Sequence, residues 1–183
     1  MAKKAARMAV VAWLAAGAFV EARTAGTRPD VTCDARPAPR HIRVMNCQLQ
    51  WIVATGLDRS PTFRQLVGRV DALDGIVYVN SGLAHRPGTS HQLDGLLQHR
   101  VVMAGSHRLT FVTMAPASGK RAVATLAHEL QHVIELLESD ATSEADAYEL
   151  FRRIGITVAA SEMETAGALE IQRAVLKELT AGR

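Results

Sequence analysis

The sequence predicts an α+β domain with a small, mostly antiparallel sheet. Two observations lead to this class. Segments with the apolar spacing of amphipathic helices come first and last, and three short runs with strand character lie between them. This order suits helices packed on one sheet. The expected elements are helices at about 47–57, 61–73, 123–138, 143–153 and 162–179, and strands at 76–80, 96–103 and 108–114.

The first 22 residues have the layout of a secretory signal peptide. Lys3, Lys4 and Arg7 form a basic start, and an uncharged, mostly apolar run of thirteen residues, Met8–Val20, follows it. This run is shorter than the roughly twenty residues that a membrane span needs. We therefore expect a secreted or periplasmic protein, which would meet a membrane only through an uncleaved N-terminal segment.

The basic character of the chain comes largely from that segment. The sequence of 183 residues carries a formal net charge of +3, and residues 1–22 contribute three basic side chains and one acidic one. Without them the net charge falls to +1. The charge therefore gives no case for a nucleic-acid partner.

Residues 23–40 are rich in Arg, Thr, Pro and Gly, so we expect an extended or disordered leader over residues 23–46. We place the single folded domain at 47–183, which is a usual length for one domain. The two cysteines, Cys33 and Cys47, form an even pair, and in an exported protein such a pair favours a disulfide over two free thiols.

Local signals predict the scaffold elements. Ser60 is a capping residue that precedes a proline at the first position of the second helix. Residues 76–80 are β-branched and aromatic, hence a strand, and residues 81–94 are expected to form a loop. The turn at 104–107 contains a glycine and separates two further strand-like runs, which predicts a β-hairpin.

The chemistry is expected at residues 128–132, which read His-Glu-x-x-His. Apolar residues recur at steps of three and four through this stretch, so the motif belongs to an amphipathic helix. His128 and His132 lie one turn apart on one stripe and can share a metal ion, and Glu129 can reach a water bound to that ion. Two imidazoles and a carboxylate suit Zn²⁺. The competing interpretation is a surface helix with two solvated histidines.

This motif resembles the signature of the zincin family of zinc metallopeptidases. The resemblance covers residues 128–132 and, more loosely, the layout around them. It implies a zincin-like fold, in which a sheet precedes the motif helix and the edge strand binds an extended peptide. It also implies that His128 and His132 hold zinc, and that Glu129 activates a zinc-bound water for attack on a peptide carbonyl.

The third metal ligand must come from another part of the chain. The metzincin branch of the family has a glycine and a third histidine where this chain has Glu135 and Glu138, so that branch is excluded. The gluzincin branch takes a glutamate from a later helix. The downstream candidates are Glu144, Glu149, Glu162, Glu164 and Glu170.

An antiparallel return of the next helix would bring Glu149 level with His132 and leave Glu144 more than a turn short. Two arginines follow Glu149 at helical pairing distance, which favours a solvated ion pair there. Tyr148 would be level with the site as well. It could donate a hydrogen bond to the oxyanion of the reaction, or belong to the core.

Glu164 is the favoured third ligand. It begins an apolar stripe on the last expected helix, where a carboxylate is costly unless it has a partner such as zinc. The alternative is a capping box, in which Glu164 bonds the backbone of Ser161. Glu164 and Thr165 also look like the start of the Glu-bearing second motif of small, exported, gluzincin-like bacterial proteins. Thr165 could orient a ligand.

We therefore expect a secreted or periplasmic zinc metallopeptidase that acts on a peptide or protein substrate. The alternative is a non-catalytic exported binding module with a zincin-like fold and a structural or vestigial metal site. A metal enzyme that acts on other substrates is a third possibility, because the motif supplies an activated water and no specificity pocket.

Overall fold

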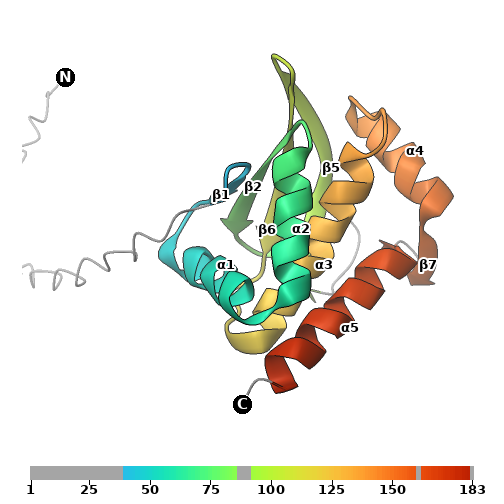
Figure 1. Ribbon diagram of the computed structural model, residues 1–183. Coiled ribbons are helices and arrows are strands. Elements are labelled where there is room, and N and C mark those ends of the chain that lie inside the picture. Colours follow the sequence, from blue (N-terminus) through green and yellow to red (C-terminus); the bar gives the residue numbers. More distant parts are fainter. Residues whose placement is uncertain (1–38, 86–91, 160–161, 182–183) are drawn as a thin grey trace, which may run out of the picture. The chain divides into compact units, whose positions relative to one another are not determined.

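The computed structural model describes residues 39–85, 92–159 and 162–181, and these form an α+β fold. A four-stranded mixed sheet is covered by helices on one face (Figure 1). Its strands stand in the order β1 (Ile42–Val44), β2 (Gly75–Ser81), β6 (His107–Met114) and β5 (Gly95–Ala104). Strand β5 is therefore an edge strand of the sheet.

The expectation of a mostly antiparallel sheet is wrong. Strands β1 and β2 pair in parallel, as do β2 and β6, and only β5 and β6 pair antiparallel. The three-residue strand β1 lies in the segment that was expected to be a leader, so its pairing was not predicted. Two helices connect β1 to β2, which is the kind of crossover that parallel neighbours require. Since the His41 carbonyl accepts a hydrogen bond from the Val77 N–H, the folded part begins before Cys47.

The hairpin of β5 and β6 is confirmed. Gly105 has a φ of 63° in the turn between them, which favours glycine because it has no Cβ. Residues 81–94 are not only a loop. In the described part of this stretch, β3 (Ala84–His85) and β4 (Gln92–Leu93) form a two-stranded antiparallel pair.

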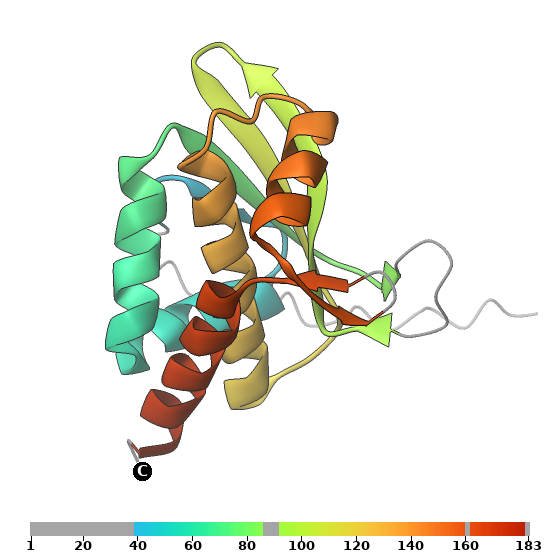
Figure 2. The same ribbon diagram turned by 90° about the vertical axis from the view of Figure 1, so that its right-hand side faces the viewer.

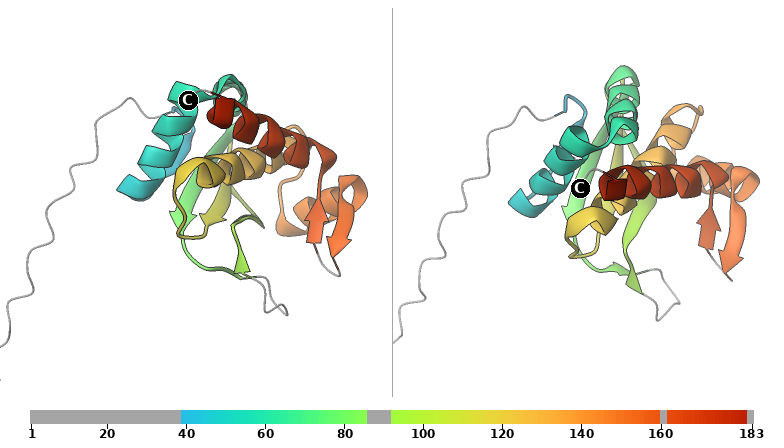
Figure 3. Two further views of the ribbon diagram at one scale, coloured as in Figure 1. Left: turned by 90° about the horizontal axis from the view of Figure 1, so that it is seen from below. Right: turned by 60° about the horizontal axis from the view of Figure 1, so that its bottom comes forward.

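The helices of the described part are α1 (Cys47–Arg59), α2 (Pro61–Ala72), α3 (Gly119–Leu137), α4 (Glu144–Ile154) and α5 (Ala166–Ala181). Helices α1, α2, α3 and α5 stand on one side of the strands, and α4 lies beside the edge strand β5 (Figure 2). Figure 3 shows α5 alongside α3, where these two helices pack together.

Helix α3 is the centre of the core. Fifteen of its nineteen residues are buried, because the sheet lies on one side of it and other helices pack around it. A helix buried on nearly all sides differs from the amphipathic helix that the sequence suggests. Polar side chains on α3 therefore need partners inside the protein.

The C-terminal end of α3 is held by one arginine. The Arg108 side chain is 8% exposed, and it forms an ion pair with Asp74 at 2.7 Å. Its guanidinium also donates to carbonyl oxygens at the end of α3 and in the turn that follows, those of Leu136, Leu137, Ser139 and Ala141. These carbonyls lie in the last turn of α3 and just beyond it, so Arg108 fixes the motif helix to the sheet.

Two predicted helix starts are confirmed. The Ser60 hydroxyl accepts a hydrogen bond from the Phe63 N–H at the start of α2. Ser143 and Asp146 form a capping box at the start of α4.

The last helix begins later than expected, at Ala166 and not near Glu162. In its place, β8 (Glu162–Glu164) pairs antiparallel with β7 (Ile156–Ala159). The Thr165 hydroxyl accepts a hydrogen bond from the Ala168 N–H and so caps α5.

Residues 1–38 lie outside the described part of the chain. The signal peptide and the disulfide between Cys33 and Cys47 therefore stay predictions. Cys47 is the first residue of α1. In the described part, no helix is both long enough and apolar enough to cross a bilayer.

Candidate metal centre

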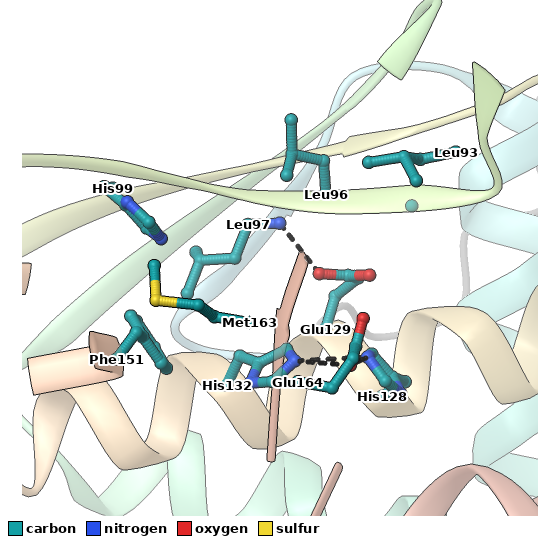
Figure 4. Close-up of a pocket in the computed structure, with 11 residues that line it drawn as sticks. Leu93, Leu96, Leu97, His99, His128, Glu129, His132, Phe151, Met163 and Glu164 are labelled. Atoms are coloured by element: carbon teal, nitrogen blue, oxygen red, sulfur yellow. Dashed lines mark hydrogen bonds and ion pairs between the residues drawn. The ribbon is translucent and has the colours of Figure 1, made fainter. Parts of the chain in front are cut away.

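Three side chains direct their donor atoms at one point. The Nε2 atoms of His128 and His132 are 3.1 Å apart. Glu164 Oε2 lies 2.7 Å from His128 Nε2 and 3.4 Å from His132 Nε2. Figure 4 shows these side chains pointing toward one another, two from α3 and one from the end of β8. The group could hold a metal ion.

The site is buried but reachable. The two histidine side chains are each 8% exposed, whereas that of Glu164 is 27% exposed. The interpretation as a surface helix with solvated histidines is therefore wrong. The capping-box alternative for Glu164 is wrong as well, because Thr165 caps α5 and the Glu164 carboxylate faces the two histidines.

Glu135 is a partner of the site that the sequence analysis missed. His132 Nδ1 lies 3.2 Å from Glu135 Oε2, and since a carboxylate only accepts, His132 carries a proton on Nδ1. Its Nε2 lone pair is then available to a metal. Glu135 Oε1 accepts from Thr165 Oγ1 at 2.9 Å and from Gln131 Nε2 at 3.0 Å. The position of Glu135, about one turn after His132 on the same helix, was the signal that could have revealed this contact. In the sequence analysis that position was used only to exclude the metzincin branch.

Thr165, which the sequence suggested as a residue that could orient a metal ligand, contacts Glu135. Its hydroxyl donates to Glu135 on α3 while it caps α5. A Cβ at Gly167 would stand 3.0 Å from Glu135 Oε1, so the small residue lets α5 approach α3 closely. The carboxylate of Glu135 thus links the helix of His132 to the segment of Glu164.

His128 lacks such a partner. Its Nδ1 is buried and has no hydrogen-bond acceptor among the described residues. The two motif histidines therefore differ in their surroundings: among the described residues, His132 has a carboxylate partner at Nδ1 and His128 has none there.

The glutamate of the motif is held by the edge strand. Glu129 is buried, and its Oε2 accepts a hydrogen bond of 2.7 Å from the Leu97 N–H of β5. A Cβ at Gly95 would stand 2.8 Å from Glu129 Oε1, so the strand can approach only where it has no side chain. Burial raises the pKa of Glu129 above its usual value.

The charges of the site are coupled. Burial by itself favours neutral forms, but hydrogen bonds from His128 and His132 lower the pKa of Glu164 to about 2. Burial also opposes a charge on His132, yet hydrogen bonds to Glu135 and Glu164 raise its pKa to about 9. For Glu135, hydrogen bonds from His132, Gln131 and Thr165 outweigh burial and lower the pKa. A metal ion would replace the proton that this cluster otherwise retains.

The other residues proposed from the sequence lie away from the centre. Tyr148 is 49% exposed and does not line the cleft that lies over the three donor atoms. The centroid of its ring is 6.1 Å from that of the His99 ring. Glu149 pairs with Arg152 at 2.8 Å on the surface, as the two arginines suggested. Glu144 is an exposed residue in the first turn of α4.

A cleft opens over the three donor atoms. Besides His128, Glu129, His132 and Glu164, it is lined by β5, by the adjoining residue of β4, and by side chains from α4 and β8. These further residues are Leu93, Gly95, Leu96, Leu97, His99, Phe151 and Met163. Apolar side chains therefore flank a polar centre in this cleft.

Comparisons of this chain with protein-family models, with curated proteins and with solved structures gave no match. The site is therefore defined by its own geometry. It is a two-histidine, one-glutamate group able to hold a metal, with a second buried glutamate beside it.

Proposed function

We propose that this protein is a zinc-dependent peptidase of the gluzincin-like kind. One observation supports it above all: Glu164, distant in sequence, brings a carboxylate oxygen to both motif histidines. Two imidazoles and one carboxylate are a donor set of catalytic zinc sites, which leave a further position for water or substrate. When bound, zinc supplies a Lewis acid that polarises a peptide carbonyl and makes water more acidic.

Glu129 suits the role of general base. The Leu97 N–H holds one of its carboxylate oxygens and leaves Oε1 outside that hydrogen bond. Burial raises the pKa of Glu129 from its usual value in the direction of neutral pH. A pKa shifted in this direction suits a group that accepts a proton from water and returns it to a leaving amine. The hydrogen bond comes from the contact between α3 and β5, and the raised pKa comes from burial.

Strand β5 suits the binding of an extended peptide. It pairs with β6 along one side, and the Leu97 N–H is turned to the other side, toward Glu129. A peptide added along this side of β5 would pass over the cleft and the metal group. The layout of a sheet, an edge strand and the motif helix supports the zincin-like assignment.

The test is metal content and hydrolysis in matched variants. We expect the purified mature protein to contain zinc and to cleave an unstructured protein substrate. Glu129→Gln should retain zinc and lose about 100-fold or more of the activity, as expected for a general base. Glu149→Gln removes a carboxylate from an exposed ion pair and should change neither property.

Protein without zinc would refute the proposal, as would unchanged hydrolysis in the Glu129→Gln variant. Zinc binding without hydrolysis of any peptide would favour the non-catalytic binding module. Export from the cytoplasm is a separate proposal that rests on residues 1–22. Sequencing the N-terminus of the protein recovered outside the cytoplasm tests it.

A further inference from the structure

One end of the cleft is built from side chains that the proposed catalytic chemistry does not use. Figure 4 shows His99, Met163 and Phe151 grouped on one side of the metal group, with Leu93 and Leu96 toward the other side. The three grouped residues come from β5, β8 and α4. We name them the aromatic wall.

The aromatic wall is continuous with the metal group. The Phe151 ring lies edge-on to the ring of His132, with centroids 5.5 Å apart. The His99 ring stacks on Phe151 at 5.4 Å, with only 14° between the planes. A side chain bound against this wall would therefore lie in the same cleft as the metal group, beside it.

The wall is also firmly supported. Phe151 is 2% exposed and belongs to the core, and Met163 packs against that core. Met163 directly precedes Glu164, so its position is tied to that of the third donor. His99 lies on β5 two residues after Leu97, the residue that holds Glu129.

These groups favour one kind of occupant. Flat rings attract other rings in stacked or edge-on arrangements, and a methionine sulfur packs well against ring edges. A ring of the substrate would find the imidazole of His99 and the thioether of Met163 together, with the buried Phe151 ring behind them. Small or acidic side chains would leave this apolar surface without contacts.

We propose that the aromatic wall is the specificity subsite of the peptidase, and that it takes an aromatic side chain next to the scissile bond. This inference rests on the proposed function. His99 and Met163 are its specificity-determining residues. Phe151 also supports His132, so its substitution would change the metal group as well.

Peptides of one sequence that carry Phe, Leu, Ala or Asp at each position flanking the cleavage site test this proposal. We expect the zinc-loaded protein to prefer Phe over Ala by about 10-fold or more in kcat/KM at one of these positions. The variants His99→Ala and Met163→Ala should each lose most of that preference, mainly through KM, while zinc content stays unchanged. Met103→Ala is a matched control, because Met103 lies on β5, is 49% exposed and does not line the cleft.

A binding measurement separates this inference from the proposed function. Zinc-loaded Glu129→Gln protein is titrated with the hydroxamates of phenylalanine and alanine, which chelate zinc and differ only in the phenyl ring. Tighter binding of the phenylalanine compound, lost in the double variant with His99→Ala, supports the subsite even if no peptide is cleaved. No preference for Phe in the parent protein overturns the inference, and so does a preference that both His99→Ala and Met163→Ala retain.

Discussion

The carboxylate of Glu135 offers the most direct test of how the metal centre is built. The change is Glu135→Gln, which keeps the size of the side chain and removes its charge. In the native chain Glu135 accepts hydrogen bonds from His132, Thr165 and Gln131, and its side chain is 15% exposed. The variant keeps one oxygen for these three donors, and its NH₂ group cannot accept from the others.

The size of the effect follows from these contacts. An outer partner of a metal-bound histidine contributes about 10- to 100-fold to metal affinity. This range corresponds to about 1.4–2.7 kcal/mol of binding free energy. We expect a loss of this size, because the ring of His132 is no longer held by a carboxylate.

The assay is competition for zinc between the protein and a chelator of known affinity, with folding checked by circular dichroism. Glu138→Gln is the control, because Glu138 directly follows α3 and forms an exposed ion pair with Arg69. Such surface pairs contribute at most about 1 kcal/mol to stability. Zinc affinity of the folded Glu135→Gln protein within about threefold of the native value, below the expected range, would refute the proposed orientation of His132.

The remaining predictions concern pH, the edge strand and the fold. Folding raises the pKa of His132 from 6.5 to about 9. The metal-free protein should therefore be more stable at pH 6.5 than above pH 9, and its free energy of unfolding should fall by up to about 3 kcal/mol over this interval. Urea denaturation at a series of pH values measures this, and a stability that rises over the same interval would contradict the coupling. Zinc binding should release about one proton near neutral pH, and calorimetry in buffers of different ionisation enthalpy measures this number. Binding without proton release would also contradict the coupling. Gly95→Ala should displace Glu129 and lower kcat by about 10-fold or more, with zinc retained. The control is Gly68→Ala, which has open space around it and should leave kcat unchanged. Equal activities of the two variants would argue that the edge strand does not position Glu129. Arg108→Met should lower the free energy of unfolding by about 2–4 kcal/mol, since it removes the guanidinium that donates to the carbonyls at the end of α3 and just after it. An unchanged urea midpoint would exclude the anchoring of α3.

Signals that act over a few residues predicted the local structure well. Helix spacing, the cap at Ser60 and the turn at Gly105 gave four of the helices and the hairpin close to their observed bounds. The start of α5 was misplaced because Ser161 and Glu164 have the spacing of a capping box. The structure uses Thr165 as the cap, and a local pattern cannot show which of two caps a helix uses.

Pairing between distant segments was the part that the sequence did not reveal. Strand β1 has only three residues, too few for a periodic signal, and its parallel pairing with β2 depends on two intervening helices. The all-round burial of α3 was hidden for a similar reason. An apolar stripe shows that one face is buried, but only the packed neighbours decide whether the polar face is buried too.

The sequence by itself determined that His128, Glu129 and His132 share one helix, because their spacing fixes their relative positions within a turn. It narrowed the third donor to a few glutamates and favoured Glu164. Tertiary structure decided the rest. It brought the carboxylate of Glu164 to the two histidines through the β7–β8 pair, placed Glu135 behind His132, and left Tyr148 outside the cleft. The physical reason is that spacing along a helix fixes distances only within that helix. Distances between helices and strands depend on packing, here of α5 on α3 and of α4 on β5.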